Sequence, residues 1–267
     1  MSDAVPRELA VALDRTADRR GPFGEPLHYF TEIGSTNDEA ARLADAGASE
    51  GTTVVASMQS SGRGRLGRQW FSPADAGLYA SVVVRDRRAA PLLTLAGGVA
   101  VAEGIRAAAG LPVEIKWPND VVIDAGLGRR RKLAGLLAEA SSGAEGLHYV
   151  VLGFGVNLLP AAYPPDIGGR ATSIAAELGR PVEAGVLLAE CLASLADVVQ
   201  ALTSGDSGSV LDRWLRLAPS SHGSRVEWDG AAGPVSGVTD GITSDGALLV
   251  RAGARTEAIR SGVVRWL

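Results

Sequence analysis

The sequence predicts an α+β protein: a large domain with a mixed sheet, followed by a small all-β domain. Between residues 27 and 218, helical and strand-like segments follow one another without the regular alternation of a parallel α/β fold. After the linker-like stretch 219–223, short strand-like segments are separated by Asp229-Gly230 and Asp245-Gly246, which are hairpin signals. We therefore expect a lead segment at 1–26, a main domain at 27–218 and a C-terminal domain at 219–267.

The elements of the first half follow from apolar periodicity and from turn residues. Residues 7–20 are expected to form one amphipathic helix that Gly21-Pro22 ends, and a further helix should run from residue 35 to about 46. Strands are expected at 28–33, 53–57 and 79–85. The apolar stretch 92–109 contains Glu103 and Arg106, which favours a buried helix over a membrane span.

The second half continues the same mixture. Strands are expected at 113–116, 121–124 and 148–158, and helices at 183–202 and 210–217. Residues 35–37 (Ser-Thr-Asn) stand at a helix start, and Thr36 with Glu39 three residues later makes a capping box. The cap alone explains these residue types, although a helix N-terminus is also rich in hydrogen-bond donors for a ligand.

Composition excludes several classes of protein. The 267 residues carry a formal net charge of −4, whereas a dedicated nucleic-acid binder has a basic footprint. The single cysteine excludes an intrachain disulfide and fits a reducing compartment. The N-terminal residues lack the apolar core of a signal peptide, so we expect a cytoplasmic protein with no membrane partner.

The most informative segment is 62–70, which reads Gly-Arg-Gly-Arg-Leu-Gly-Arg-Gln-Trp. Glycine lets backbone N–H groups approach a ligand closely, and arginine forks suit carboxylate and phosphate. Trp70 offers a face on which a base such as adenine could stack. A small anion with an aromatic base is one reading; a flexible basic loop or an RGG-type nucleic-acid segment is the other.

A second unusual string, Lys-Trp-Pro-Asn-Asp, occupies residues 116–120. Pro118 cannot donate to a ladder, so the preceding strand should end there. This leaves Lys116 at a strand end, with Asn119 and Asp120 on the exit turn, where binding residues often lie. Without this motif, a strand-end lysine that forms a surface ion pair would be the better explanation, since lysines are mostly exposed.

Taken together, these motifs resemble the biotin–protein ligases. The matching blocks are, in order, 34–37 (Gly-Ser-Thr-Asn), 59–70, 116–120, 132–139 (Lys-Leu-Ala-Gly-Leu-Leu-Ala-Glu), 153–157 (Gly-Phe-Gly-Val-Asn) and 171–173 (Ala-Thr-Ser). The resemblance runs from about residue 27 to the C-terminus. The blocks at 59–70 and 116–120 are specific, and the order of all six identifies the family.

The resemblance implies a catalytic domain of the biotin/lipoate protein ligase type with a small SH3-like barrel after it, and a monofunctional enzyme without an N-terminal DNA-binding domain. It implies ATP-dependent attachment of biotin, through biotinyl-5'-AMP, to one lysine of a biotin carboxyl carrier domain such as that of acetyl-CoA carboxylase. ATP and biotin are then the substrates, and Mg²⁺ is expected with ATP. Nucleic acid is not expected as a partner, and a homodimer through sheet edges is possible.

The resemblance also implies residue roles. Lys116 should bridge the biotin carboxyl and the α-phosphate, and Arg65 should retain the adenylate; these two are the catalytic residues. The biotin-binding residues are Ser35, Thr36, Asn37, Gln59, Gly62, Arg63, Gly64, Arg65, Lys116, Gly135, Leu136, Gly153 and Gly155. The ATP-binding residues are Arg65, Arg68, Trp70, Asn119, Lys132 and Asn157. No metal ligand is assigned.

Three alternatives remain at the level of sequence. A lipoate or octanoate ligase would share the broad fold, but the strings at 62–70 and 116–120 are associated with biotin members. A biotin-sensing regulator is disfavoured by the acidic composition, and an inactive scaffold by the presence of Lys116, Arg63 and Arg65. One departure is that Ser-Gly-Val-Val stands at 261–264 where the family often has Ser-Gly-Glu-Val.

Overall fold

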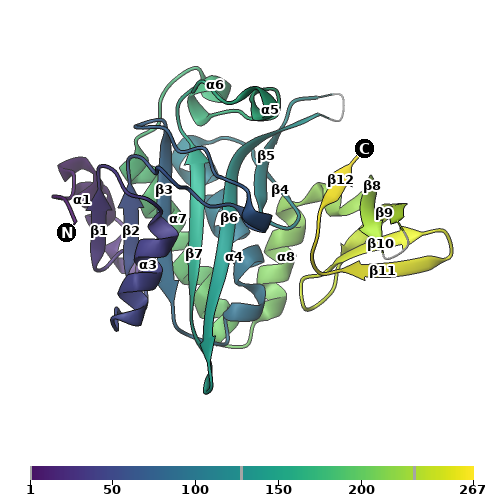
Figure 1. Ribbon diagram of the computed structural model, residues 1–267, viewed down its shortest axis with the longest axis horizontal. Coiled ribbons are helices and arrows are strands. Elements are labelled where there is room, and N and C mark those ends of the chain that lie inside the picture. The colour runs from purple at the N-terminus through teal and green to yellow at the C-terminus, as the bar shows by residue number, and fades with distance from the viewer. Residues whose placement is uncertain (1, 127–128, 231–232) are drawn as a thin grey trace.

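The computed structural model describes residues 2–126, 129–230 and 233–267. Two sheets organise the chain, a seven-stranded sheet with helices on both faces and a five-stranded sheet beside it (Figure 1). The large sheet contains β1 (Leu27–Phe30), β2 (Thr53–Ala56), β3 (Gly77–Val84), β4 (Glu114–Lys116), β5 (Asp120–Asp124), β6 (Arg130–Gly143) and β7 (Gly146–Asn157).

The strand order of the large sheet is β1-β2-β3-β7-β6-β5-β4. β1 and β2 run parallel, and every other neighbouring pair is antiparallel. The predicted α+β class with a mixed sheet is thereby confirmed. Because β6 and β7 form a long central hairpin, residues from both strands share the middle of one face.

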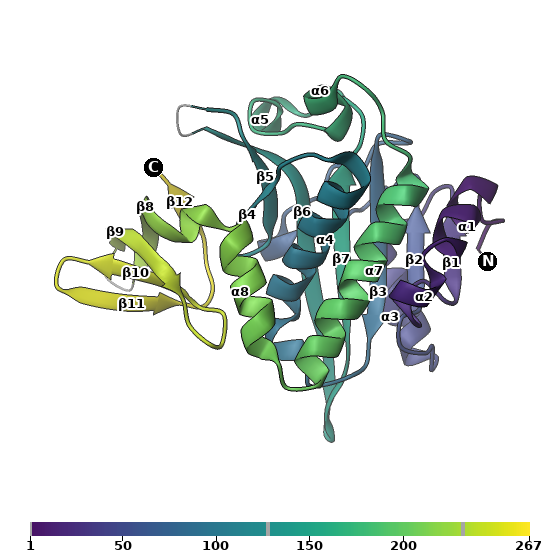
Figure 2. The ribbon, with the colours of Figure 1, turned by 180° about the vertical axis from the view of Figure 1, so that it is seen from behind.

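The two faces of the sheet are covered differently. Helices α4 (Leu93–Ala109), α7 (Ala184–Thr203) and α8 (Ser207–Leu217) lie behind the sheet, and α3 (Thr36–Asp45) lies on the other face (Figures 1 and 2). The stretches 90–109 and 184–203 are long and apolar enough to cross a membrane by composition, but most of each is buried within the protein. Two short helices, α5 (Pro165–Gly168) and α6 (Ile174–Leu178), follow β7.

The expectation of one helix over residues 7–20 is wrong, because the chain forms α1 (Arg7–Asp14) and α2 (Ala17–Arg20). Thr16 separates them: its N–H and its hydroxyl both donate to the carbonyl of Leu13, each at 3.1 Å. A threonine hydroxyl that bonds the local backbone competes with the helix ladder. The helical segment does end at Gly21, which has a φ of +52°.

The predicted capping box is displaced by one residue. Ser35, not Thr36, is the N-cap of α3, and its side chain accepts from the N–H of Asp38. Glu39 instead pairs with Arg42 one turn further along the helix, at 2.7 Å. The Thr36 hydroxyl is therefore not used in capping.

The second sheet contains β8 (His222–Gly230), β9 (Gly233–Ile242), β10 (Leu248–Ala252), β11 (Arg255–Ile259) and β12 (Val264–Trp266), in the order β11-β10-β9-β8-β12. All its pairs are antiparallel. The predicted turn at Asp245-Gly246 lies between the paired strands β9 and β10. Asp229 and Gly230 instead form the paired end of β8, opposite Pro234 and Gly233 of β9, and residues 231–232 between these two strands lie outside the described part of the chain. The pairings end at β11 and β12, so closure into the expected barrel stays a prediction.

The second sheet is docked on the edge of the first. The indole N–H of Trp117, directly after β4, donates to the carbonyl of Gly246 at 3.0 Å. Gly246 has a φ of +81°, and a Cβ there would lie 2.7 Å from Leu95 of α4. Only glycine satisfies both the turn and the contact. The β9–β10 turn thus anchors the small sheet beside β4.

Close helix packing behind the large sheet depends on Gly104 of α4. A Cβ on Gly104 would lie 2.5 Å from Cys191 Sγ and 2.8 Å from the Cys191 backbone nitrogen in α7. Cys191 is fully buried, and burial raises the pKa of its thiol far above the ordinary value. It therefore packs as a small apolar residue at this contact.

We expect Gly104→Ala to destabilise the protein by about 1–3 kcal/mol, because the added methyl forces α4 and α7 apart. The matched control is Gly98→Ala in the same helix, where a Cβ would meet Ile115 at an ordinary 3.6 Å. That change should raise stability by up to about 1 kcal/mol through helix propensity. Urea unfolding followed by circular dichroism measures both, and equal effects would contradict the close-packing account.

Candidate functional site

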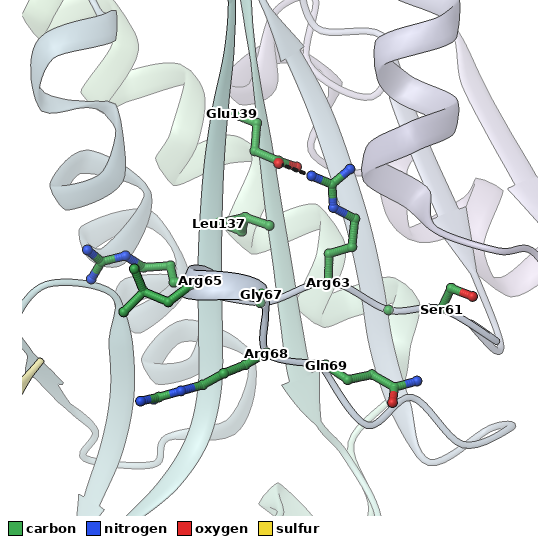
Figure 3. A pocket seen from close by; sticks show the side chains of 11 residues that line it. Ser61, Arg63, Arg65, Gly67, Arg68, Gln69, Leu137 and Glu139 are labelled. Atoms are coloured by element: carbon green, nitrogen blue, oxygen red, sulfur yellow. Dashed lines mark hydrogen bonds and ion pairs between the residues drawn. The ribbon is translucent and has the colours of Figure 1, made fainter. Parts of the chain in front are cut away.

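The arginine–glycine segment folds into a small loop above β6. Its ends are joined by bonds from the N–H of Gly64 to the carbonyl of Arg68 (2.8 Å) and from the N–H of Trp70 to the carbonyl of Gly62 (2.9 Å). At its tip the non-glycine residue Leu66 takes a left-handed φ of +58°. Between this loop and the outward side chains of Leu137 and Glu139 lies an open hollow of about 490 Å³ (Figure 3).

The arginines of the loop point to different parts of the site. Figure 3 shows Arg63 extended toward Glu139, whereas Arg65 and Arg68 point to the opposite side of the loop. Arg63 forms ion pairs with both Asp38 of α3 and Glu139 of β6. Arg65 is half-buried, and its guanidinium donates to Asn119 Oδ1 at 3.4 Å. One short loop thus supplies cations to two ends of the site.

A hydrogen-bonded network, mostly of uncharged side chains, forms the end nearest α3. The N–H and hydroxyl of Thr36 both donate to Gln59 Oε1, at 2.8 and 3.0 Å. Ser81 Oγ, on β3, lies 2.8 Å from Thr36 Oγ1 and 2.6 Å from Asn37 Oδ1. Asn37 donates in turn to Glu139 at 2.8 Å. Such a network fixes side-chain orientation in a buried polar site.

Two glycines make room for this network. A Cβ on Gly153 of β7 would lie 1.9 Å from Asn37 Oδ1, so any larger residue would displace the amide. A Cβ on Gly62 would lie 2.6 Å from Ser72 Oγ, which itself accepts a bond from Gln59 at 2.9 Å. These glycines are needed for the close approach of side chains, and their predicted contact with biotin stays a prediction.

At the centre of the site, the indole ring of Trp70 packs against two glycines. Gly135 of β6 and Gly155 of β7 are directly opposite each other in the ladder. Cβ atoms on them would lie 2.9 and 2.3 Å from the ring of Trp70. The Lys132 ammonium lies 5.0 Å from the centroid of the same ring, within cation–π range. The buried Trp70 Nε1 has no hydrogen-bond partner.

The other end of the site is strongly cationic. Lys132 pairs with Asp120 at 2.6 Å, and Asp120 is opposite Lys116 in the β4–β5 ladder. Burial is the main cause that lowers the pKa of Lys116 below its ordinary value, and the Asp120 carboxylate opposes it. Three neighbouring cations lower that pKa further: Lys132, Arg130 and Arg170. Burial likewise lowers the pKa of Arg65, again opposed by Asp120.

The positions of the lysines give a further indication. Lysine and arginine together number 26, and just two of them are lysines, Lys116 and Lys132. Both lie in the cationic end of the site. Ammonium and guanidinium differ in size, hydration and hydrogen-bond geometry. The placement of both lysines of the sequence in the site fits a role for a compact ammonium group there.

Three predicted site residues act partly through the backbone or a structural bond. The side-chain amide of Asn119 donates to the backbone carbonyl of Leu136 at 2.7 Å, and the backbone carbonyl of Asn119 accepts from the N–H of Leu136 at 2.9 Å. The Leu136 side chain packs against α4, since a Cβ on Gly97 would lie 2.9 Å from it. Asn157 is buried and donates to the carbonyl of Thr172 at 2.8 Å. Their ligand contacts stay predictions.

Sequence reasoning did not assign Ser81, Ser72, Glu139 or Trp266, all of which the structure places in or against the site. Ser81 had a signal, because it is a polar residue in an otherwise apolar strand at 77–84. Glu139 lay inside a recognised block but had no role, and it proves to contact both Asn37 and Arg63. Trp266, on β12, has no local signal at all; the Lys116 ammonium lies 4.8 Å from its ring centroid.

The arrangement suits a ligand with two chemically different parts. The network around Thr36 and Gln59 can hydrogen-bond an uncharged polar group, while Lys116, Lys132 and Arg65 can bind carboxylate or phosphate. Among the described residues, no nucleophile is paired with a base in the site. Preorganised cations around a reacting anion favour group transfer by positioning and electrostatic stabilisation.

Comparison with known proteins gives a consistent result. The profile of the biotin/lipoate A/B protein ligase family matches residues 29–157. The biotin–[acetyl-CoA-carboxylase] ligase of Paracoccus denitrificans is 32% identical over 242 residues, covering 86% of this chain and 96% of that protein. The structure of a biotin protein ligase from Aquifex aeolicus in complex with biotin and ATP aligns with a TM-score of 0.76 and 27% identity, covering 90% of this chain and 98% of that one.

The bifunctional ligase/repressor BirA of Bacillus spizizenii is 37% identical over 171 residues, which is 62% of this chain and 51% of the relative. The chain thus spans about half the length of that relative. The Paracoccus ligase, by contrast, is matched over nearly its whole length. Together with the loop, the two lysines and the paired glycines of the site, these matches show that the chain belongs to the biotin–protein ligase family.

Proposed function

We propose that this protein is an ATP-dependent biotin–protein ligase. It joins biotin to AMP, releasing pyrophosphate, and transfers the biotinyl group to one lysine of a biotin carboxyl carrier domain. The observation that carries the proposal is the convergence of Lys116, Lys132 and Arg65 on Asp120 beside the neutral network of Thr36 and Gln59. This pairing of a cationic end with a hydrogen-bonding end matches the phosphate and the ureido ring of biotinyl-AMP.

In the first step a biotin carboxylate oxygen attacks the α-phosphorus, and the bond from that phosphorus to the pyrophosphate oxygen breaks. The two reactants are both anions and repel each other. The Lys116 ammonium, half-buried at the end of β4, offsets this repulsion and stabilises charge on the transferring phosphoryl group. Lys132 and Arg68 contribute at the phosphates, and Trp70 supplies a ring face for adenine.

In the second step the neutral amine of the acceptor lysine attacks the biotinyl carbonyl carbon, and AMP leaves. Arg65 holds the adenylate in the site until the acceptor arrives, because its half-buried guanidinium and Asn119 lie at the cationic end. The acceptor proposed is a carboxyl carrier domain such as that of acetyl-CoA carboxylase. A homodimer through the sheet edges and a location in the cytoplasm belong to the same proposal.

Magnesium is proposed as part of the MgATP substrate. Among the described residues no group of three His, Cys, Asp or Glu side chains could hold a metal ion. Asp120 is already paired with Lys132, so no protein ligand is assigned to the ion. Magnesium commonly keeps several waters and binds through substrate phosphates.

The decisive test is to incubate the protein with MgATP and either biotin or lipoate, and to identify the bound product by native mass spectrometry. We expect a retained biotinyl-AMP adduct and none from lipoate. A lipoyl adduct would transfer the chain to the neighbouring ligases. Bound biotin without AMP would overturn adenylation and favour a biotin-sensing protein or an inactive scaffold.

Replacing Lys116 by Gln should slow pyrophosphate release in a single turnover by about 10²- to 10³-fold, because a positioned charge at the reacting phosphate is lost. Biotin affinity should change far less, since the network around Thr36 is untouched. Rapid-quench kinetics and calorimetry measure the two quantities. A variant that released pyrophosphate at the original rate would exclude Lys116 from the chemistry.

Arg65→Gly should still form biotinyl-AMP but release it. The loss of one charged hydrogen-bonding group, about 2 kcal/mol, corresponds to roughly 30-fold faster release. Gel filtration of the preformed complex followed by quantification of retained adenylate gives the rate. Gln69→Ala, on the exposed edge of the same loop, is the matched control and should retain the adenylate normally. Unchanged retention in Arg65→Gly would refute the role.

A further inference from the structure

The C-terminal sheet reaches the proposed reaction centre through one side chain. Trp266 lies on β12, which pairs with β8, and its ring centroid is 4.8 Å from the ammonium of Lys116. The next residue after the lysine, Trp117, is bonded to Gly246 of the same sheet. Two consecutive residues at the end of β4 therefore contact the small sheet.

The face of the Trp266 ring, rather than its N–H, makes the contact. Nε1 of Trp266 is buried and has no hydrogen-bond partner. Tryptophan has the most favourable ring for attracting a cation. The Lys116 ammonium lies over this ring within cation–π range.

We propose that Trp266 is a positioning residue for the reaction, which holds the Lys116 ammonium over the place where the carboxylate and α-phosphate meet. This inference rests on the proposed function. The small sheet then completes the site of the large domain, because β12 fixes the direction in which the lysine points. Trp70 holds Lys132 in the same way, at 5.0 Å, from the loop side.

Several charged groups face Lys116 and must be considered with the ring. Asp120 on β5 favours the charged ammonium, whereas Lys132 and Arg130 on β6, and Arg170 after α5, disfavour it. Because three cations and one carboxylate act on Lys116, its charged form gains from further stabilisation. The electron-rich face of Trp266 provides it without introducing a negative charge that would repel the substrates.

The composition of the chain makes a direct test possible. Because Lys116 and Lys132 are the two lysines of the sequence, protein labelled with ¹³C at the lysine ε-carbon gives two side-chain signals. Lys132→Arg assigns them. In Trp266→Leu, which keeps the site apolar but removes the ring, the titration midpoint of Lys116 should fall. The titration midpoint of Lys132 should not change. Trp266→Phe should restore most of the decrease in the Lys116 midpoint.

Kinetics of adenylation provide the second readout. We expect Trp266→Leu to lower kcat about 10- to 30-fold with the KM for biotin nearly unchanged, and to move the alkaline limb of the rate profile to lower pH. Trp266→Phe should lie within about threefold of the unchanged protein. The control is Arg265→Gln on the outward face of β12, where the guanidinium pairs with Glu227 and Asp229. It should leave kcat, KM and both midpoints unchanged.

The outcomes separate this inference from the proposed function. A fall of the Lys116 midpoint that Phe restores supports the positioning role, even if no adenylate of any kind is formed and the proposed function fails. An unmoved midpoint in Trp266→Leu overturns the role. So does an equal fall for Lys116 and Lys132, or an equal loss in Arg265→Gln, since either result would reflect general loosening of the small sheet.

Discussion

The site depends on the electrostatic attraction between the Asp120 carboxylate and the cations around it. Two ammonium groups and a guanidinium are held near one another in a half-buried place, and like charges so arranged repel each other strongly. Asp120 lies among all three, directly paired with Lys132 and electrostatically coupled to Lys116 and Arg65. Its position follows from the sharp turn between β4 and β5, which brings the residue opposite Lys116 in the ladder.

The remaining elements can be understood as supports for this arrangement. The paired glycines of β6 and β7 lower the floor of the site so that an indole ring can lie flat on it. The helices behind the sheet make that floor rigid, because close-packed interiors deform little. The arginine–glycine loop above the sheet contributes further cations to the site. Each support comes from a different part of the chain, so the site exists only once the sheet is assembled.

Much of this could be predicted from sequence. Local patterns located most strands and helices and the Asp245-Gly246 turn of the small sheet, and the motif residues Thr36, Gln59, Lys116 and Trp70 do meet around one region. The failures have physical causes. Thr16 interrupted a helix through a bond that periodicity does not show. Ser35 is the cap in place of Thr36, whose hydroxyl donates to Gln59 in the segment after β2. Trp266 could not be placed because its neighbour is 150 residues earlier, and such contacts are set by tertiary packing.

The scarcity of lysine has a practical consequence for anyone who handles this protein. Some reagents react with primary amines, including the activated esters that couple proteins to sensor surfaces, dyes or cross-linkers. Their targets in this chain are the α-amine and the side chains of Lys116 and Lys132, and both side chains lie in the site. The arginine-rich exterior does not react with them. Attachment through lysine would therefore block the very groups under study, whereas a tag at a terminus, or chemistry directed at carboxylates far from Asp120, would leave them free.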